Sequence, residues 1–324
     1  MTRSHVLSLV ITLVSLCTAA ETPAQMIEEP WSEGGLHGTI ARPGKPARGP
    51  AVLIIAGSGP TDRNGNGPPN PDGSKPFLNT DSYRLLAAGL ASNGIVSLRY
   101  DKRGIAESRA LASREDDVVF DHFVTDAITA LQSLQSRPGV ASVVIAGHSE
   151  GGMIALAAAQ RVPVAGLVLL TTSGRTYLAL LRAQLKGRLP PDLEARSDAI
   201  MDSLAAGKRV DDLPPPLAAL FRPSAQPFLI SIGNFDPAAA LAQSKVPALL
   251  VHAGRDLQVG QADFDALRNG RKDAQILILP EANHTLKVSP ADLDGNRALY
   301  SNPSAPLDPA LMPRMVEFIS SVTP

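Results

Sequence analysis

A serine that could act as a nucleophile lies at the centre of residues 147–151, which read Gly-His-Ser-Glu-Gly around Ser149. An apolar run at 142–146 comes directly before this pentapeptide, and the helix-compatible stretch 152–159 follows it. A G-x-S-x-G sequence at a strand-to-helix turn holds its serine on a sharp corner, where the flanking glycines avoid collisions with neighbouring backbone. The pattern therefore indicates a nucleophile elbow with Ser149 at its tip.

A serine hydroxyl is a poor nucleophile at neutral pH unless a base accepts its proton and an acid orients that base. In proteins with such an elbow, the acid and then the histidine come later in the chain, each at the end of a strand. The apolar runs at 249–253 and 275–280 are followed by Asp256 and His284, respectively. His284 is also the one histidine among six that lies after the candidate acid. We therefore predict a catalytic triad of Ser149, Asp256 and His284.

Other side chains fit these roles less well. His252 lies within an expected strand and is expected to be a buried core histidine. Asp263 and Asp265 fall in a helical pattern, and Glu281 lies too close to the candidate histidine to orient it. The alternative interpretation of Asp256 is an ordinary turn aspartate, because Gly-Arg-Asp is a common loop sequence.

The chain resembles the α/β-hydrolases, and within them a bacterial esterase subgroup. Residues 56–66 read A-G-S-G-P-T-D-R-N-G-N, which is similar to the G-S-G-P-T-D-R-[DN]-G-N loop after the third strand of that subgroup. Residues 147–152 match its G-H-S-E-G-G elbow. The resemblance extends from about residue 35 to the end of the chain and implies hydrolysis of carboxylic esters. One departure is that Ala56-Gly57 replaces the His-Gly pair found in many family members.

The same loop is expected to complete an oxyanion hole. A tetrahedral oxyanion needs two backbone donors, one from the residue after the nucleophile and one from the loop after the third strand. We predict the amides of Glu150 and Ser58, with Gly57 or Gly59 as alternatives to Ser58. The side chain of Glu150 is expected to be a solvated carboxylate on the rim of the site.

A calcium site is the alternative interpretation of this loop, because residues 62–67 copy the first six positions of a calcium-binding EF-hand. The twelfth position is Gly73 instead of a glutamate, Pro68 and Pro69 interrupt the loop, and the pattern before it is a strand instead of a helix. We therefore expect a turn-rich active-site loop without a metal.

The N-terminus predicts a secretory leader. The apolar run at 6–16 follows a basic start and is followed by small residues, so residues 1–24 are expected to be a signal peptide cleaved after Ala20 or Ala24. The run is shorter than the roughly 20 residues of a permanent membrane span. The residue before Cys17 is not small, which argues against a lipid anchor. The mature protein would be secreted or periplasmic and would contain no cysteine.

Composition favours one large globular domain. The chain of 324 residues has 30 basic and 31 acidic residues and is 44% hydrophobic, which predicts a single α/β domain over 25–324 with a substantial core. It contains no block of like charge, and aromatic residues make up only 4%. Nucleic acid is therefore not an expected partner.

Strand patterns alternate with helical patterns along most of the chain. This alternation is typical of a mostly parallel twisted sheet flanked by helices. The charged residues at 100–108 are expected to brace loops. A hairpin-like start near 36–42 precedes the expected strands, which lie near 51–56, 95–100, 142–147, 165–171, 247–253 and 275–280.

The alternation stops over residues 173–244, which predict a helical cap inserted between the sixth and seventh strands. Helical patterns there are separated by three prolines at 214–216. Apolar side chains such as Phe221 and Phe228 are expected to shape the substrate pocket or to pack the cap onto the body. A second insertion at 288–309 is expected to line the rim of the same pocket.

These features predict a carboxylesterase-type serine hydrolase that acts on small-molecule esters with short to medium acyl chains and needs no cofactor. A serine peptidase, an aminopeptidase or a β-lactam-hydrolysing enzyme would use the same triad. A thioesterase would need access to acyl-CoA, which a secreted location does not give. A non-catalytic binding module usually lacks one member of the triad, and here all three are present.

Overall fold

The structure is a computed structural model that describes residues 26–45, 48–70, 72 and 76–323. The expected leader, residues 1–24, lies outside the described residues, as does Gly73, the twelfth position of the calcium-loop comparison. Among the described helices, none has the length and apolar character needed to cross a membrane.

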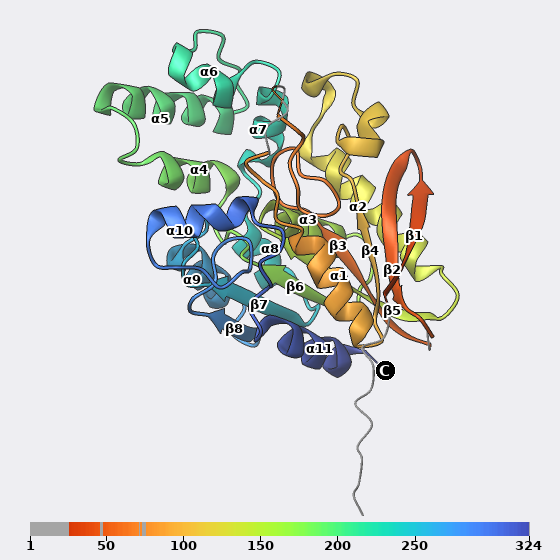
Figure 1. The fold of residues 1–324 in the computed structure, drawn as a ribbon. Helices are drawn as coiled ribbons and strands as arrows, with labels where there is room; N and C mark the ends of the chain where they lie inside the picture. The colour runs from red at the N-terminus through yellow and green to blue at the C-terminus, as the bar shows by residue number, and fades with distance from the viewer. Residues whose placement is uncertain (1–25, 46–47, 71, 73–75, 324) are drawn as a thin grey trace, which may run out of the picture.

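An eight-stranded sheet runs through the molecule in the order β1-β2-β4-β3-β5-β6-β7-β8 (Figure 1). The pairs β1–β2 and β2–β4 are antiparallel, and all later neighbours are parallel. This mostly parallel sheet with helices on both faces confirms the predicted fold class. The strands are β1 (Met26–Glu33), β2 (Leu36–Pro43), β3 (Gly49–Ile55), β4 (Val96–Tyr100), β5 (Val140–His148), β6 (Gly166–Leu170), β7 (Ala248–Ala253) and β8 (Gln275–Leu279).

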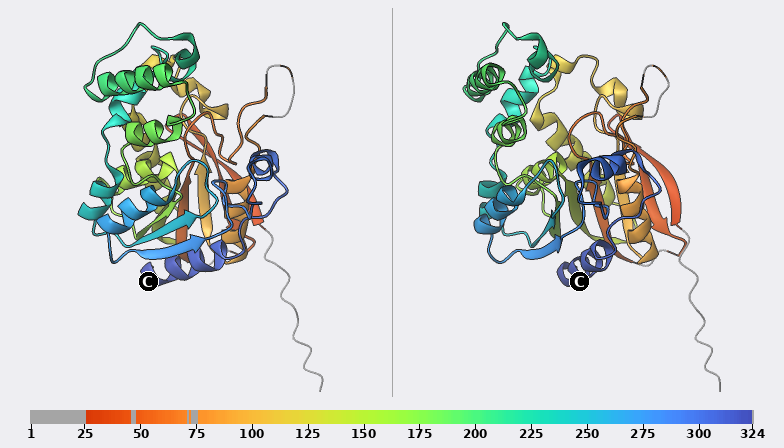
Figure 2. Two further views of the ribbon diagram at one scale, coloured as in Figure 1. Left: turned by 90° about the vertical axis from the view of Figure 1, so that its left-hand side faces the viewer. Right: turned by 60° about the vertical axis from the view of Figure 1, so that its left-hand side comes forward.

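Alternate side chains of the central strands enter two apolar clusters, one on each face of the sheet. In β3, Leu53 and Ile55 enter one cluster, whereas Val52 and Ile54 enter the other. Four helices cover the first face and two cover the second (Figures 1 and 2). The first face carries α2 (Phe120–Gln135), α3 (Glu150–Ala159), α8 (Pro237–Gln243) and α9 (Gln261–Gly270), and the second carries α1 (Ser82–Ser92) and α11 (Leu311–Val322).

Four helices between β6 and β7 form an apolar cluster of their own. Figures 1 and 2 show them gathered beyond one end of the sheet. Helix α8 also lies between these strands, but it packs against α3 and α9 and contributes to the first cluster. The four separate helices are α4 (Tyr177–Leu185), α5 (Pro191–Ala205), α6 (Pro215–Phe221) and α7 (Gln226–Gly233).

The segment after β8 is tied to the loop before α1 by Lys287. Its buried ammonium donates hydrogen bonds to the carbonyl oxygens of Thr80 and Asn302, both at 2.6 Å. Burial lowers the pKa of Lys287 to about 8. This segment contains the short helix α10 (Leu293–Ala298) and the 3-10 turn η3 (Leu299–Ser301), and two further 3-10 turns follow β4, η1 (Ala106–Leu111) and η2 (Glu115–Asp117).

Glycines let α3 begin directly against β3. A Cβ atom added to Gly151 would lie 2.3 Å from the carbonyl oxygen of Ile55, and one added to Gly147 would lie 2.3 Å from the carbonyl oxygen of Gly151. These separations are far below van der Waals contact, so a larger residue would force the helix away from the sheet. The predicted reason for the flanking glycines is therefore confirmed.

We expect Gly151→Ala to lower the free energy of unfolding by at least about 2 kcal/mol, because overpacking usually costs about 1–3 kcal/mol and here the obstacle is backbone. Gly49→Ala is the matched control, because its added Cβ meets none of the described atoms within 4 Å. Its stability should change by no more than about 0.5 kcal/mol. Urea unfolding followed by circular dichroism measures both, and equal stability of the two variants would contradict the collision.

Candidate active site

Ser149 occupies the turn between β5 and α3 with φ of 53° and ψ of −120°. A positive φ is strained for a residue with a side chain, and such strain is typical of functional turns. Two backbone hydrogen bonds hold the turn. The Ser149 amide donates to the carbonyl oxygen of Leu170 at 2.9 Å, and the Gly152 amide donates to the carbonyl oxygen of Ser149 at 3.0 Å. The serine is thus presented on a rigid corner at the beginning of a helix.

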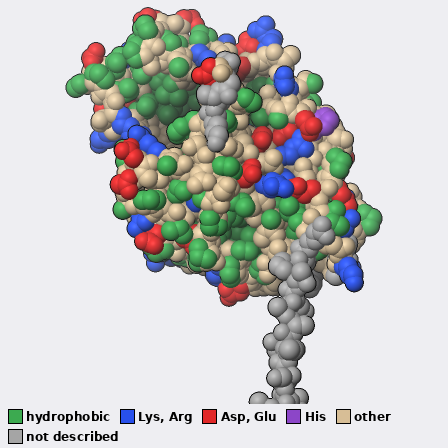
Figure 3. Space-filling view, viewed as in Figure 1, with side chains coloured by type: hydrophobic (Ala, Val, Ile, Leu, Met, Phe, Trp, Pro, Cys, Tyr) green, Lys and Arg blue, Asp and Glu red, His purple; other side chains and the backbone are tan. Residues whose placement is uncertain are grey.

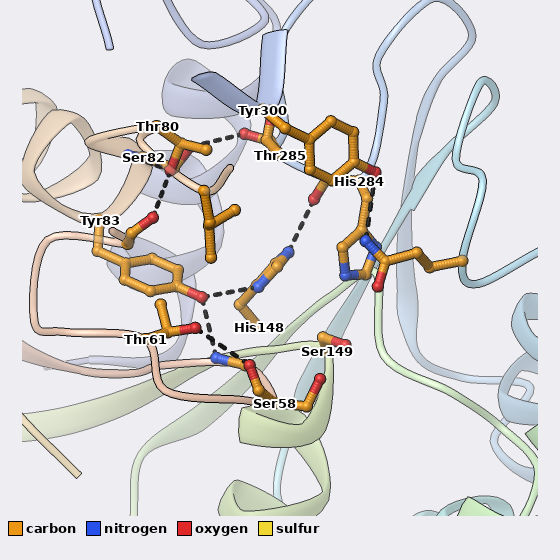
Figure 4. A pocket seen from close by; sticks show the side chains of 14 residues that line it. Ser58, Thr61, Thr80, Ser82, Tyr83, His148, Ser149, His284, Thr285 and Tyr300 are labelled. Carbon is orange, nitrogen blue, oxygen red and sulfur yellow. Dashed lines mark hydrogen bonds between the residues drawn. The ribbon is translucent and has the colours of Figure 1, made fainter. Parts of the chain in front are cut away.

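Asp256 and His284 lie on the loops after β7 and β8, which are neighbours in the sheet. Nδ1 of His284 donates to Oδ2 of Asp256 at 2.7 Å. The other carboxylate oxygen accepts the amides of Gln258 and Val259 at 2.7 and 3.0 Å, which holds the acid in place. His284 and Ser149 line the same cavity of about 80 Å³ (Figure 4). The structure therefore brings the three predicted triad residues to one site.

The competing residues have other contacts. His252 is buried and stacks on Phe264 with ring centroids 5.0 Å apart, as expected for a core histidine, and burial lowers its pKa. Asp263 is fully buried and accepts hydrogen bonds from Ser173 and Arg175. Glu281 is mostly exposed and pairs with an arginine. Each of these three residues therefore has a partner other than the candidate base.

The two predicted oxyanion donors lie beside the nucleophile. Ser58, Ser149 and Glu150 line a second small cavity of about 50 Å³. Within the described part of the chain, no backbone or side-chain acceptor engages the amides of Ser58, Gly59 or Glu150. The amide of Gly57, in contrast, donates to the hydroxyl of a tyrosine at 2.9 Å. The structure therefore removes Gly57 from the alternatives and leaves Ser58 and Gly59.

Lys102, on the loop after β4, is a site residue that the sequence did not single out. Its buried Nζ donates to the carbonyl oxygen of Gly57 at 2.6 Å and to Oε1 of Glu150 at 3.2 Å. The Gly57 carbonyl and the Ser58 amide belong to one planar trans peptide and point in opposite directions. Lys102 therefore sets the direction of the Ser58 N–H.

The prediction that Glu150 carries a solvated rim carboxylate is wrong. Its side chain is 4% exposed and forms a buried ion pair with Lys102, because the loop after β4 passes beneath the elbow. Other charges of that loop brace it as predicted. Arg103 forms a bidentate pair with Asp126 at 2.7 and 2.5 Å, and Asp101 accepts the backbone amide of Arg63 at 2.8 Å.

The loop at 62–67 turns around Asp62. Its Oδ1 accepts the amides of Asn64 and Asn66 at 2.8 and 2.9 Å, so this oxygen is occupied by the loop's own backbone. Across the residues described, no group of three or more histidine, cysteine or acidic side chains could hold a metal ion.

A larger cavity of about 530 Å³ lies between the body and helices α6 and α7. It shares Glu150 and Tyr177 with the second small cavity beside the serine. Figure 3 shows a hollow with hydrophobic side chains beside these helices. Phe228 lines the large cavity, whereas Phe221 is fully buried within the separate helical cluster. The sequence predicted the same two possible roles for both phenylalanines, but only Phe228 lines the cavity.

His148 lies beneath the site, and sequence analysis assigned it no role. Its Nδ1 lies 2.9 Å from the hydroxyl of Tyr83, and its Nε2 lies 2.8 Å from the carbonyl oxygen of His284 (Figure 4). Burial, assisted by the nearby His284, lowers the pKa of His148 to about 3. The ring is therefore neutral at physiological pH and serves as a hydrogen-bonding group.

Comparisons with known proteins agree with this architecture. The sequence profile of the family described as serine aminopeptidase, S33 matches residues 79–290. Esterase EstD of Thermotoga maritima is 28% identical over 267 residues, which are 82% of this chain and 61% of EstD, so the chain spans about three fifths of that relative.

Two solved structures are similar in fold. The esterase Pf2001 of Pyrococcus furiosus has a TM-score of 0.54 and 14% identity, with 92% of this chain and 91% of that chain covered. Est1E of Butyrivibrio proteoclasticus has a TM-score of 0.54 and 16% identity, with 90% and 99% covered. At these identities the likeness concerns the fold alone.

The lowered pKa of His148 has a consequence for stability. Between about pH 6.5 and 3 the unfolded chain binds a proton at this histidine and the folded chain does not. The contribution of His148 to the free energy of unfolding is therefore complete above pH 6.5 and falls on acidification, by up to about 1.4 kcal/mol per pH unit. Urea unfolding at pH 6.5, 5.5 and 4.5 should give a steeper loss for the wild type than for His148→Gln. If the free energy of unfolding fell equally with pH in both proteins, the lowered pKa of His148 in the folded state would be contradicted.

Proposed function

Because the chain belongs to the serine aminopeptidase S33 family and has the α/β-hydrolase fold, we propose that it is a serine hydrolase that cleaves carboxylic esters of short to medium acyl length. The observation that carries the proposal is the 2.7 Å hydrogen bond between Asp256 and His284, beside a cavity that His284 shares with Ser149. The relative EstD is an esterase by name, which supports ester substrates.

The proposed reaction is a two-step acyl transfer. Nε2 of His284 takes the hydroxyl proton of Ser149, and the serine oxygen attacks the ester carbonyl carbon. The carbonyl electron pair moves onto oxygen, where the amides of Ser58 and Glu150 stabilise the oxyanion. When the intermediate collapses, His284 gives the proton to the departing alcohol oxygen. Water then attacks the acyl-enzyme by the same steps and releases the acid.

Two features of the site would stabilise the negative oxyanion and the positive His284 ring of this reaction. The Glu150 amide belongs to the first turn of α3, where free N–H groups and the helix dipole favour a negative charge. The Asp256 carboxylate keeps the Nδ1 proton of His284 in place and stabilises the ring when it becomes positive. The developing positive and negative charges therefore each have a prearranged partner.

The family description makes an aminopeptidase the second candidate. Such an enzyme must hold the free ammonium group of its substrate, for which a nearby unpaired carboxylate is the usual partner. Among the described residues lining the two small cavities, the only carboxylate is that of Glu150, and Lys102 already pairs with it. This pairing favours an ester over an amino-terminal peptide. Amino-acid anilides should accordingly be poorer substrates than simple esters.

The cap proposed over residues 173–244 would form one wall of the acyl site. His284 must reach the leaving alcohol, and it lines the cavity of about 80 Å³ but not the two that include Glu150. The alcohol would therefore lie on the side of His284, and the acyl chain would extend toward Tyr177 and Phe228. We further propose, from the leader, that the reaction occurs in the periplasm or outside the cell.

Replacing Ser149 with alanine tests the proposed function. We expect Ser149→Ala to lose at least about 10³-fold of the kcat/KM for nitrophenyl acetate, with little change in stability, because only one hydroxyl is removed. An organophosphonate should label Ser149 stoichiometrically in the wild type. Ser173, whose hydroxyl donates to Asp263, is an internal control that should stay unlabelled. Retained activity in the variant, or labelling of Ser58 or Ser173, would rule out this nucleophile.

Variants of Phe228 and Phe221 distinguish a residue that lines the cavity from one that only packs the inserted helices. Phe228→Ala should lower kcat/KM for octanoyl esters at least about tenfold more than for acetyl esters, because each methylene without an apolar contact forfeits about 0.8 kcal/mol. Phe221→Ala should lower the free energy of unfolding by about 3–5 kcal/mol and leave the acyl-length profile unchanged. Kinetics with acetyl, butyryl and octanoyl esters, together with thermal unfolding, measure both. A uniform loss of kcat/KM across the three esters in Phe228→Ala would refute the proposal that Phe228 lines the acyl site.

A further inference from the structure

A chain of four hydrogen-bonded groups runs beneath the candidate active site in one direction. The carbonyl oxygen of His284 can only accept, so Nε2 of His148 carries a proton and donates to it at 2.8 Å. The ring of His148 is neutral, so its Nδ1 has no proton and accepts from the hydroxyl of Tyr83 at 2.9 Å. The oxygen of Tyr83 in turn accepts the amide of Gly57 at 2.9 Å. Every donor and acceptor in this chain is thereby determined.

This chain of hydrogen bonds joins the three segments that carry the proposed chemistry. Gly57 precedes the oxyanion donor Ser58, His148 precedes the nucleophile, and the last acceptor is the backbone of the base His284. Figure 4 shows Tyr83 and His148 lying between these segments. The loop also lies directly against the elbow, since a Cβ on Gly57 would be 3.0 Å from Nδ1 of His148. The position of any one segment is thus coupled to the other two.

Helix α1 anchors this arrangement at its first turn. Tyr83 is held there, and its neighbour Ser82 donates to the carbonyl oxygen of Thr285 at 2.9 Å. Both side chains are buried, as is His148. Loss of one group would leave the facing polar atoms unsatisfied in the protein interior, so the segments would move to find other partners.

We propose that Tyr83 and His148 are positioning residues that hold the oxyanion loop and the backbone of His284 in register with Ser149. The proposal rests on the ester hydrolysis proposed above. Their role differs from ordinary packing because it depends on individual hydrogen bonds of the Tyr83 hydroxyl and the His148 ring. Removing the Tyr83 hydroxyl breaks the link to the oxyanion loop and leaves the link between His148 and His284 intact.

The central comparison uses Tyr83→Phe and Tyr100→Phe. Tyr100 is also a buried tyrosine, but among the described residues its hydroxyl has no hydrogen-bond partner. We expect Tyr83→Phe to lower kcat for nitrophenyl acetate about 10- to 100-fold with KM changed by less than about twofold, because an oxyanion donor acts on the transition state. Tyr100→Phe should stay within about twofold of the wild type in both constants.

A transition-state analogue gives a second readout. Phenylboronic acid accepts the oxygen of Ser149 at boron, and the resulting tetrahedral adduct places an oxygen in the oxyanion hole. Its affinity should fall in Tyr83→Phe by the same factor as kcat, while KM stays unchanged. Equal losses in KM and boronate affinity, or equal behaviour of Tyr83→Phe and Tyr100→Phe, would overturn the proposal.

Substitutions of His148 test the two links separately. Asparagine can replace the Nδ1 acceptor, whereas glutamine can replace the Nε2 donor. Tyr83→Phe combined with His148→Gln should be no worse than the poorer single variant, because both break the same link. Tyr83→Phe combined with His148→Asn should be worse than either single variant, because both links are broken. The reverse order would overturn the proposal that Tyr83 and His148 act through these two links.

One measurement is independent of catalysis. In ¹⁵N-histidine NMR spectra, the resonance absent from His148→Gln identifies His148. It should belong to a neutral ring with the proton on Nε2 from pH 7 to 4, and its Nδ1 signal should move in Tyr83→Phe but not in Tyr100→Phe. A signal that does not move, or a ring that titrates above pH 5, would overturn the chain of hydrogen bonds.

The two proposals can fail separately. Ester turnover by the wild type that is lost in Ser149→Ala upholds the proposed function. If it holds and Tyr83→Phe matches Tyr100→Phe, the positioning role alone is wrong. If the wild type hydrolyses no ester, the proposed function fails, and the NMR comparison still decides whether the chain of hydrogen bonds exists.

Discussion

A buried backbone N–H or C=O must have a hydrogen-bond partner, and Gly57 lies just beyond the last regular bond of β3. Its N–H donates to Tyr83, and its C=O accepts from Lys102, so two consecutive peptide planes are held. Because Gly57 has no side chain, this rigid loop can lie against the elbow. The direction of the Ser58 amide, and with it the form of the proposed oxyanion hole, depends on these two bonds.

Buried ammonium groups connect segments that are distant in the chain. Lys102 joins the loop after β4 to the loop after β3 and to the elbow, with Glu150 compensating its charge. Lys287 has two carbonyl oxygens as acceptors and joins the loop before α1 to the segment after β8. Burying a charge is costly, and an apolar pair could stabilise the fold equally well. What the lysines provide is a defined arrangement of loops around the candidate site.

The sheet and the inserted helices contribute different parts of the site. Ser149 directly follows β5, and Asp256 and His284 lie on the loops after the neighbouring strands β7 and β8, so the sheet brings the three residues to one edge. Helices α4 to α7 pack mainly around their own apolar cluster and reach the site through residues such as Tyr177 and Phe228. The walls of the large cavity can therefore vary without disturbing the groups that are proposed to react.

The sequence by itself determined the sheet with its flanking helices, the elbow and the candidate triad. The elbow was predictable because its strand, its glycines and its helix are contiguous in the chain. Asp256 and His284 were predictable because the carboxyl ends of parallel strands meet at one edge of the sheet. Each of these inferences rests on a local pattern that is repeated in a regular architecture.

Only the tertiary structure decided which side chains support that site. The pairs Lys102–Glu150 and Tyr83–His148 are separated by 48 and 65 residues. They depend on how the loop after β4 and helix α1 pack against the elbow, and this packing has no periodic pattern in the sequence. The prediction of a solvated Glu150 failed for this reason. Phe221 and Phe228 have the same chemistry, and the orientation of each helix decides which one reaches the cavity. Residue types specify what a group can do, whereas the packing of distant segments determines what it contacts.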